Sequence, residues 1–80
     1  MKVKIYSTPY CSYCRMAKNF FAEKGIVFDE IDVSIDEAAA KEMIDRTGQM
    51  GVPVIEIESD VVVGFDRAVL ENLIEKNSTK

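Results

Sequence analysis

The sequence predicts an α/β fold with the element order β-α-β-α-β-β-α, in which a four-stranded mixed sheet carries helices on both faces. Three observations support this prediction. Along the chain, segments in which apolar and polar residues alternate, as in strands, are interspersed with segments whose apolar residues recur at three- and four-residue spacing, as in helices. Gly25 and Gly48 follow two of the helical segments, where a left-handed residue commonly ends a helix. Two apolar runs, residues 53–58 and 61–64, are so close that only an antiparallel hairpin can join them.

The first half of the chain is predicted to contain a strand, a helix and a second strand. Residues 2–7 alternate in polarity and predict the first strand. The helix is expected over about residues 11–24, and its apolar stripe comprises Tyr13, Met16, Ala17, Phe20 and Phe21. Residues 26–33 predict the second strand. Such a β-α-β unit pairs its strands in parallel through a right-handed crossover, the hand found in about 98% of cases.

The second half is predicted to contain a helix, a hairpin and a last helix. Ser34 and Glu37 match the S-x-x-E capping box that opens a helix, which we expect to run to about residue 47. The buried face of this helix comprises Ile35, Ala39 and Met43. Residues 59–60 join the two hairpin strands, and Asp66 is a suitable N-cap for the last helix. The stripe of that helix comprises Val69, Leu70, Leu73 and Ile74, and the polar residues 76–80 are expected to fray.

Length, charge and composition limit the classes of protein that this chain can represent. The 80 residues predict a single domain, residues 1–80, and 48% apolar residues suffice for a compact core. The net charge of −4, with acidic and basic residues interleaved, argues against nucleic acid as a partner. No apolar run approaches the roughly 20 residues that cross a membrane, and the start lacks the apolar centre of a secretory signal. We therefore expect a cytoplasmic monomer that binds neither nucleic acid nor membranes.

The two cysteines of the chain, Cys11 and Cys14, form a C-S-Y-C motif at the predicted start of the first helix. Their spacing brings the two sulfur atoms to neighbouring positions on the helix surface, within reach of a disulfide. The positive end of the helix, with Arg15 and Lys18 nearby, should stabilise a thiolate on Cys11. Cys11 is therefore the predicted nucleophile, which forms a mixed disulfide with a substrate, and Cys14 is the resolving thiol that releases the product.

A metal centre is the alternative interpretation of the two thiols. Zinc takes four ligands, and the chain has two cysteines and no histidine, so a complete zinc site would need carboxylates or a second chain. An iron–sulfur cluster shared by two copies through Cys11 needs fewer ligands from each chain. Inert buried cysteines have no reason to stand at a helix start between Pro9 and Arg15. The sequence favours a redox dithiol without a tightly bound cofactor or metal, with a dimeric metal-binding module as the alternative.

Three motifs, in order along the chain, resemble those of the glutaredoxins, small redox proteins of the thioredoxin fold. They are YSTPYCSYCRMAKNFF, TGQMGVPVIEI and VVVGFD, and the resemblance runs over about residues 2–75. It implies a thioredoxin fold and a thiol–disulfide oxidoreductase that reduces disulfides of proteins or small molecules. In the family, the proline that matches Pro53 follows a cis bond and faces the active site. Here it would turn the backbone of Val52 toward the cysteines, free to pair with an incoming disulfide segment; the alternative is a trans proline that merely opens an edge strand.

The resemblance also implies a binding site for the substrate or for glutathione. Besides Val52 and Pro53, the implied contact residues are Tyr10, Tyr13, Gln49, Gly64, Phe65 and Asp66. Backbone N–H groups at the start of the last helix would receive a carboxylate, and Asp66 an amino group, although Asp66 serves equally as a plain N-cap. Tyr13 matches the tyrosine of the family's C-P-Y-C motif, and Gln49 matches a polar contact of the family. Simple packing is the alternative role of the two tyrosine rings.

Departures from the family pattern bear on the source of electrons. Ser12 replaces the proline of C-P-Y-C, and residues 50–51 are Met-Gly where glutathione users commonly carry a basic residue and a threonine. The Gly-Phe pair at residues 64–65 resembles instead the redoxins that thioredoxin reductase recharges and that serve ribonucleotide reductase, but their Arg-Pro-Asp continuation is absent. Glutathione and thioredoxin reductase are therefore both expected as candidate reductants.

Overall fold

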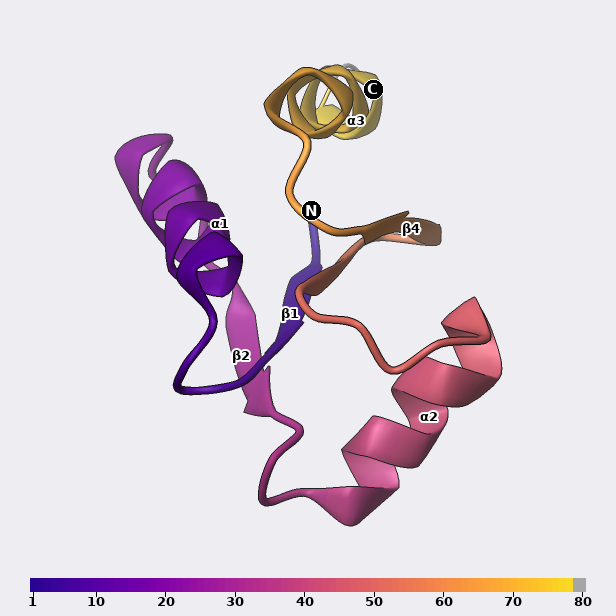
Figure 1. The fold of residues 1–80 in the computed structure, drawn as a ribbon. Coiled ribbons are helices and arrows are strands. Elements are labelled where there is room, and N and C mark those ends of the chain that lie inside the picture. The colour runs from indigo at the N-terminus through magenta and orange to yellow at the C-terminus, as the bar shows by residue number, and fades with distance from the viewer. Residues whose placement is uncertain (79–80) are drawn as a thin grey trace.

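The structure, a computed structural model, describes residues 1–78, and its elements follow the predicted order (Figure 1). They are β1 (Val3–Ser7), α1 (Ser12–Glu23), β2 (Asp29–Asp32), α2 (Glu37–Thr47), β3 (Val54–Ile57), β4 (Asp60–Val63) and α3 (Arg67–Ser78). The strands form a four-stranded sheet in the order β2-β1-β3-β4. β2 lies parallel to β1, whereas β3 runs antiparallel to both β1 and β4. The predicted mixed sheet is confirmed.

The sheet separates the core into two layers, with α1 and α3 on one face and α2 on the other (Figure 1). The first layer comprises Val3, Ile5, Ala17, Phe20, Phe21, Ile55, Ile57, Val62 and Leu70. The second comprises Tyr6, Ala39, Met43 and Val54. Neighbouring residues of β1 and β3 enter opposite layers because successive side chains of a strand point to opposite faces. Helices on both faces of this sheet confirm the predicted thioredoxin fold.

The second strand is shorter than predicted, because β2 begins at Asp29 and not at residue 26. The N–H of Ile26 donates to the carbonyl of Phe21 at 3.0 Å, so it closes the end of α1 and does not pair with β1. Val27 is 86% exposed, and the partly buried Phe28 packs against the first layer. The apolar run that predicted a strand is therefore partly the exit from a helix.

The predicted start of the second helix is wrong by two residues. The N-cap of α2 is Asp36, whose Oδ1 accepts the N–H of Ala39 at 3.0 Å. Ser34 is occupied elsewhere: its N–H and its hydroxyl both donate to Asp32 Oδ1, at 2.9 and 2.5 Å. Ile35, expected on the buried face, precedes the helix and is 82% exposed. The carboxylate of Asp36, which lies closer to the helix, caps α2 in place of the hydroxyl of Ser34.

Parts of the predicted apolar stripes also lie on the surface. In α1, Tyr13 and Met16 are exposed at 62% and 47%, and the buried face comprises Cys14, Ala17, Phe20 and Phe21. In α3, Leu70 alone of the predicted stripe is fully buried, Leu73 and Ile74 are half-buried, and Val69 is exposed. One side of a small sheet cannot cover two wide helix faces, so each helix buries a narrower strip than its sequence suggests.

The hairpin loop and the end of the last helix also differ from the prediction. Residues 58–59 form the hairpin loop, because Ile57 pairs with Asp60, which opens β4. Glu58 takes the left-handed conformation there, with φ 55°. The helix α3 continues to Ser78, past the residue where fraying was expected to begin, and the predicted fraying of residues 79–80 lies outside the described residues.

Candidate redox site

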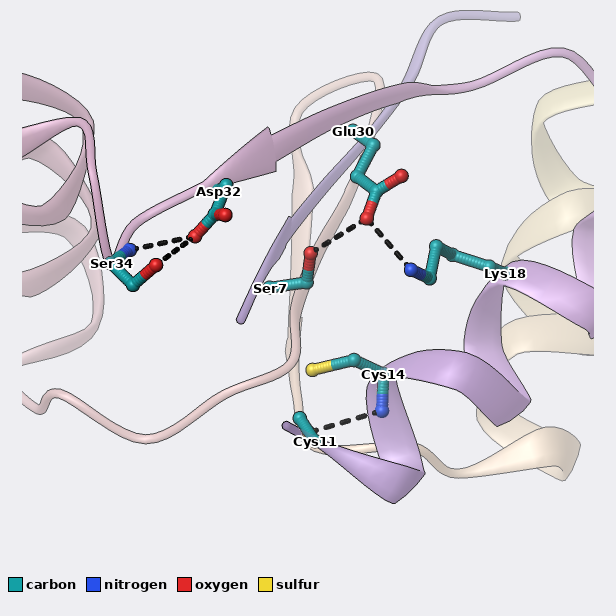
Figure 2. Close-up of polar contacts among 7 residues, drawn as sticks. All are labelled: Ser7, Cys11, Cys14, Lys18, Glu30, Asp32 and Ser34. Atoms are coloured by element: carbon teal, nitrogen blue, oxygen red, sulfur yellow. Dashed lines mark hydrogen bonds and ion pairs between the residues drawn. The ribbon is translucent and has the colours of Figure 1, made fainter. Parts of the chain in front are cut away.

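Cys11 is the N-cap of α1, one residue before the helix begins. Its backbone is extended, with φ −102° and ψ 113°, and its Sγ accepts the N–H of Cys14 at 3.1 Å. Serine and aspartate oxygens usually make this capping contact, and here a sulfur takes their place. The sulfur therefore lies at the positive end of the helix, next to backbone N–H donors (Figure 2).

Cys14 has no exposed surface and points from α1 into the protein (Figure 2). Burial, together with a hydrogen bond to Cys11, raises the pKa of the Cys14 thiol from 9.0 to about 11. A hydrogen bond to the backbone of Thr8 and the charge of Lys18 act in the opposite direction, but they do not cancel the cost of burial. Both cysteines are free in the structure, so it holds the dithiol state.

The loop before β3 approaches Cys11 from a distant part of the chain. Cys11 Sγ lies 3.8 Å from the carbonyl oxygen of Val52, a long and weak hydrogen bond from the thiol. The Val52–Pro53 peptide bond is cis, and Pro53 is buried. The N–H of Gly64 donates to the carbonyl of Pro53 at 2.7 Å. This bond joins the segment before α3 to the loop that contacts Cys11.

The Gly64-Phe65-Asp66 segment is ordered by contacts of its own. Gly64 has φ 87°, a left-handed conformation that favours glycine. The ring of Phe65 meets that of Phe20 edge to face, at 5.9 Å between centroids. Asp66 Oδ1 accepts the N–H of Val69 at 3.3 Å, so Asp66 caps α3. The structure thus brings this segment to the loop beside Cys11 and gives Asp66 the N-cap role that the sequence left open.

Tyr10, Tyr13, Gln49 and Arg15 are exposed and do not enter the core. Tyr10 is 95% exposed, so its ring does not pack in the protein. Arg15 is exposed, and its N–H donates to the carbonyl of Cys11 at 3.2 Å as part of the first turn of α1. The backbone of Gln49 is held by Thr47, whose Oγ1 accepts the N–H of Gln49 at 3.3 Å.

Sequence reasoning missed two residues near the dithiol, Ser7 and Glu30. Lys18, expected to place its charge near Cys11, instead reaches Glu30 Oε2 with its Nζ at 2.7 Å. The hydroxyl of Ser7, a buried residue at the end of β1, donates to the same oxygen at 3.2 Å (Figure 2). A polar residue at the end of a buried strand is the one feature of the sequence that could have drawn attention to Ser7.

Neither a metal centre nor a membrane-spanning helix is found among residues 1–78. Within this part of the chain, no three histidine, cysteine, aspartate or glutamate side chains are grouped closely enough to hold a metal ion. No helix there is long and apolar enough to cross a bilayer.

Comparison with known proteins assigns the chain to a family. The sequence profile of the glutaredoxins matches residues 3–62. The chain is 42% identical over 74 residues to an uncharacterised glutaredoxin-like protein of the rubredoxin operon of Clostridium pasteurianum, covering 92% of this chain and 99% of that protein. It is 38% identical over 64 residues to glutaredoxin 3 of Escherichia coli K12, covering 80% and 77% of the two chains.

A solved structure shows the same likeness in three dimensions. The NrdH-redoxin of Escherichia coli superposes with a TM-score of 0.83 at 25% identity, covering 91% of this chain and 95% of that one. The fold, the motifs and these similarities define a small thiol–disulfide redoxin with the thioredoxin fold. The chain belongs to the glutaredoxin family.

Proposed function

We propose that this chain reduces disulfides through a dithiol mechanism in which Cys11 is the nucleophile and Cys14 the resolving thiol. The contrast between the two sulfur atoms is the observation that carries the proposal. Cys11 Sγ accepts a backbone N–H at the positive end of α1 and is partly accessible. Cys14 is wholly buried, and its pKa of about 11 keeps it protonated at neutral pH. Attack on an incoming disulfide therefore falls to Cys11.

The reaction then has two exchange steps. The Cys11 thiolate attacks one sulfur of the substrate disulfide, and a bond from Cys11 to that sulfur forms while the substrate S–S bond breaks. The departing sulfur leaves as a thiolate and takes up a proton. Cys14 next loses its proton and attacks Cys11 Sγ, so that the Cys11–Cys14 disulfide forms and the second substrate sulfur leaves. Two electrons pass from the dithiol to the substrate, and an external thiol reductant restores the dithiol.

The substrate would dock on the loop that contains Val52 and Pro53. The carbonyl of Val52 lies 3.8 Å from Cys11 Sγ, so an extended segment that pairs with this backbone brings its disulfide to the nucleophile. The segment Gly64-Phe65-Asp66 is tied to the same loop and would form the far side of the site. Tyr10, Tyr13 and Gln49 are exposed, which leaves their side chains free to contact the remainder of the substrate.

Two mutations test the roles of the cysteines. Cys11→Ser should abolish disulfide reduction, whereas Cys14→Ser should accumulate a mixed disulfide with a small disulfide substrate, seen as an added mass in the intact protein. Ser12→Ala is the matched control within the motif, because Ser12 is exposed and carries no sulfur. Equal, partial losses from the two cysteine variants would contradict the assignment, and a brown, dimeric, iron-containing preparation would indicate the metal-binding module instead.

Glutathione and a flavin-dependent thioredoxin reductase are the two reductants that the family resemblance supports. The similarity to glutaredoxin 3 favours glutathione, and the NrdH-redoxin, described as having a thioredoxin-like activity profile, favours the reductase. Both systems keep thiols reduced in the cytoplasm, where we place the protein. The rate at which glutathione reduces the Cys11–Cys14 disulfide, set against NADPH with thioredoxin reductase, decides between them. Reduction by only one of the two systems excludes the other as the electron source.

A further inference from the structure

A partly buried polar cluster lies beside the resolving cysteine, built from three elements (Figure 2). Lys18 of α1 pairs with Glu30 of β2 at 2.7 Å, and Ser7 of β1 donates to the same glutamate oxygen at 3.2 Å. Ser7 is 1% exposed and directly precedes Thr8, whose backbone forms a hydrogen bond with the Cys14 sulfur. The cluster therefore adjoins Cys14.

Lys18 acts on the sulfur of Cys14 through its charge. Its ammonium favours the anionic form of that sulfur, against the larger effects of burial and of the neighbouring thiol of Cys11. Glu30 is ionised at neutral pH, because the hydrogen bond from Lys18 holds its pKa below the usual 4.5. Its negative charge, next to the ammonium, cancels part of the field that Lys18 exerts on Cys14.

The other charged and titratable neighbours of this cluster are few among the described residues. Asp32, further along β2, acts on Glu30 and raises its pKa slightly against the effect of Lys18. Arg15 belongs to α1 but is exposed. From the loop after β1, Cys14 meets the backbone of Thr8 and not a charge.

Building on the proposed function, we propose that Lys18 and Glu30 are positioning residues of the resolving step and act on the Cys14 sulfur with opposite signs. The ammonium of Lys18 stabilises the Cys14 thiolate that attacks Cys11, whereas Glu30, aimed by Ser7, restrains that ammonium and moderates its effect. In this step the proton leaves Cys14 for solvent, the Cys11–Cys14 bond forms and the bond from Cys11 to the substrate breaks. The departing substrate thiolate then takes a proton from solvent, so that charge and protons balance.

The expected effects follow from the charge of each variant. Lys18→Met removes the favourable charge and should raise the pKa of Cys14 by at most about one unit, the lower end of the range that a neighbouring charge produces, because this charge is the smallest of the effects on that sulfur. A rise of one unit would lower the thiolate fraction at neutral pH about tenfold, while the stronger nucleophile regains about threefold, so resolution slows by up to about threefold. Glu30→Gln leaves Lys18 uncompensated and should shift the pKa down and accelerate resolution, by up to about threefold. Lys18→Arg keeps the charge and should restore most of the wild-type behaviour.

The opposite effects of the two variants on the pKa of Cys14 and on the resolving rate distinguish this proposal from a merely structural role. Removing either partner breaks the same ion pair between α1 and β2, so a structural role predicts changes of the same sign in both variants. The two side chains are 29% and 45% exposed, so the ion pair contributes little to folding and both variants should remain folded.

The first experiment titrates Cys14 directly, and the second follows catalysis. In a Cys11→Ser background, thiolate absorbance against pH gives the pKa of Cys14 with wild-type residues, Lys18→Met, Glu30→Gln or Lys18→Arg. In the chain with both cysteines, rapid quenching after mixing with a disulfide substrate gives the decay rate of the mixed disulfide across pH. We expect Lys18→Met and Glu30→Gln to move both quantities in opposite directions.

The outcomes distinguish failure of this inference from failure of the proposed function. If the wild-type chain forms and resolves a mixed disulfide while both variants leave its pH profile unchanged, or shift it the same way, the inference is overturned and the function stands. If the wild-type chain reduces no disulfide, the proposed function fails, and a role in its resolving step fails with it. Opposite shifts in both the titration and the decay rate support the inference.

Discussion

The burial of Cys14 predicts that this thiol resists alkylation even when it is the only cysteine in the chain. In Cys11→Ser, the hydrogen bond between the two cysteines is altered, but burial, the largest cause of the raised pKa, is retained. A rise from 9.0 to about 11 lowers the thiolate fraction at neutral pH about a hundredfold. The greater nucleophilicity of a more basic thiolate regains about tenfold, because the Brønsted coefficient is about 0.4–0.5. Because part of this rise depends on Cys11, Cys14 in the variant should react up to about tenfold more slowly than a free cysteine, before any steric shielding.

Iodoacetamide under native conditions measures this difference. The rate for Cys11→Ser is compared with that of a short unstructured peptide that contains one cysteine, and the protein is then alkylated again in urea, where burial is lost and the two rates should converge. Cys14→Ser, in which the accessible Cys11 remains, is the matched control and should react faster than Cys11→Ser. Because the reagent reports on accessibility as well as ionisation, a ratio well above ten is also consistent with complete burial.

A native rate for Cys11→Ser equal to that of the free peptide would refute the argument. It would mean that Cys14 is neither shielded nor raised in pKa, and the division of labour between the two sulfurs would lose its physical basis. Equal alkylation rates in Cys11→Ser and Cys14→Ser would likewise contradict the argument.

Three further predictions concern the stability of the fold. Phe21→Ala should destabilise the protein by about 3–5 kcal/mol in urea unfolding, because Phe21 is fully buried in the layer beneath α1; a loss below about 1 kcal/mol would contradict that packing. Asp36→Ala should lower the free energy of unfolding by about 1 kcal/mol, and Ser34→Ala should lower it by less than about 0.5 kcal/mol. A larger loss for Ser34→Ala than for Asp36→Ala would indicate that Ser34, not Asp36, caps α2. The lowered pKa of Glu30 contributes stability above its unfolded pKa of about 4.5, and that contribution is lost as the pH falls through the folded value. The difference in unfolding free energy between wild type and Glu30→Gln should therefore shrink on acidification, and a difference independent of pH would count against the charged contact.

Local patterns in the sequence were sufficient for the order of elements, the parallel and antiparallel pairings and the position of the dithiol. Hydrophobicity is a property of each side chain, so its pattern along the sequence indicates which side chains are buried. This pattern is the alternation in residues 2–7 and the helical spacing of Ala17, Phe20 and Phe21. The C-S-Y-C motif likewise defines its own spacing, because Cys11 and Cys14 are separated by one helical turn.

Which partners these residues meet was decided only by the tertiary structure. Ile26 ends the helix α1 and does not begin a strand, and Asp36, not Ser34, caps α2. In both places several hydrogen-bond partners lie within a few residues of one another, and the folded structure determines which of them forms the bond. Lys18 and Glu30 lie twelve residues apart and carry no motif, yet the crossover from α1 to β2 brings them together beside Cys14. Charge and polarity are local properties of a sequence, whereas the burial and the distances that turn them into pKa shifts arise from contacts between remote segments.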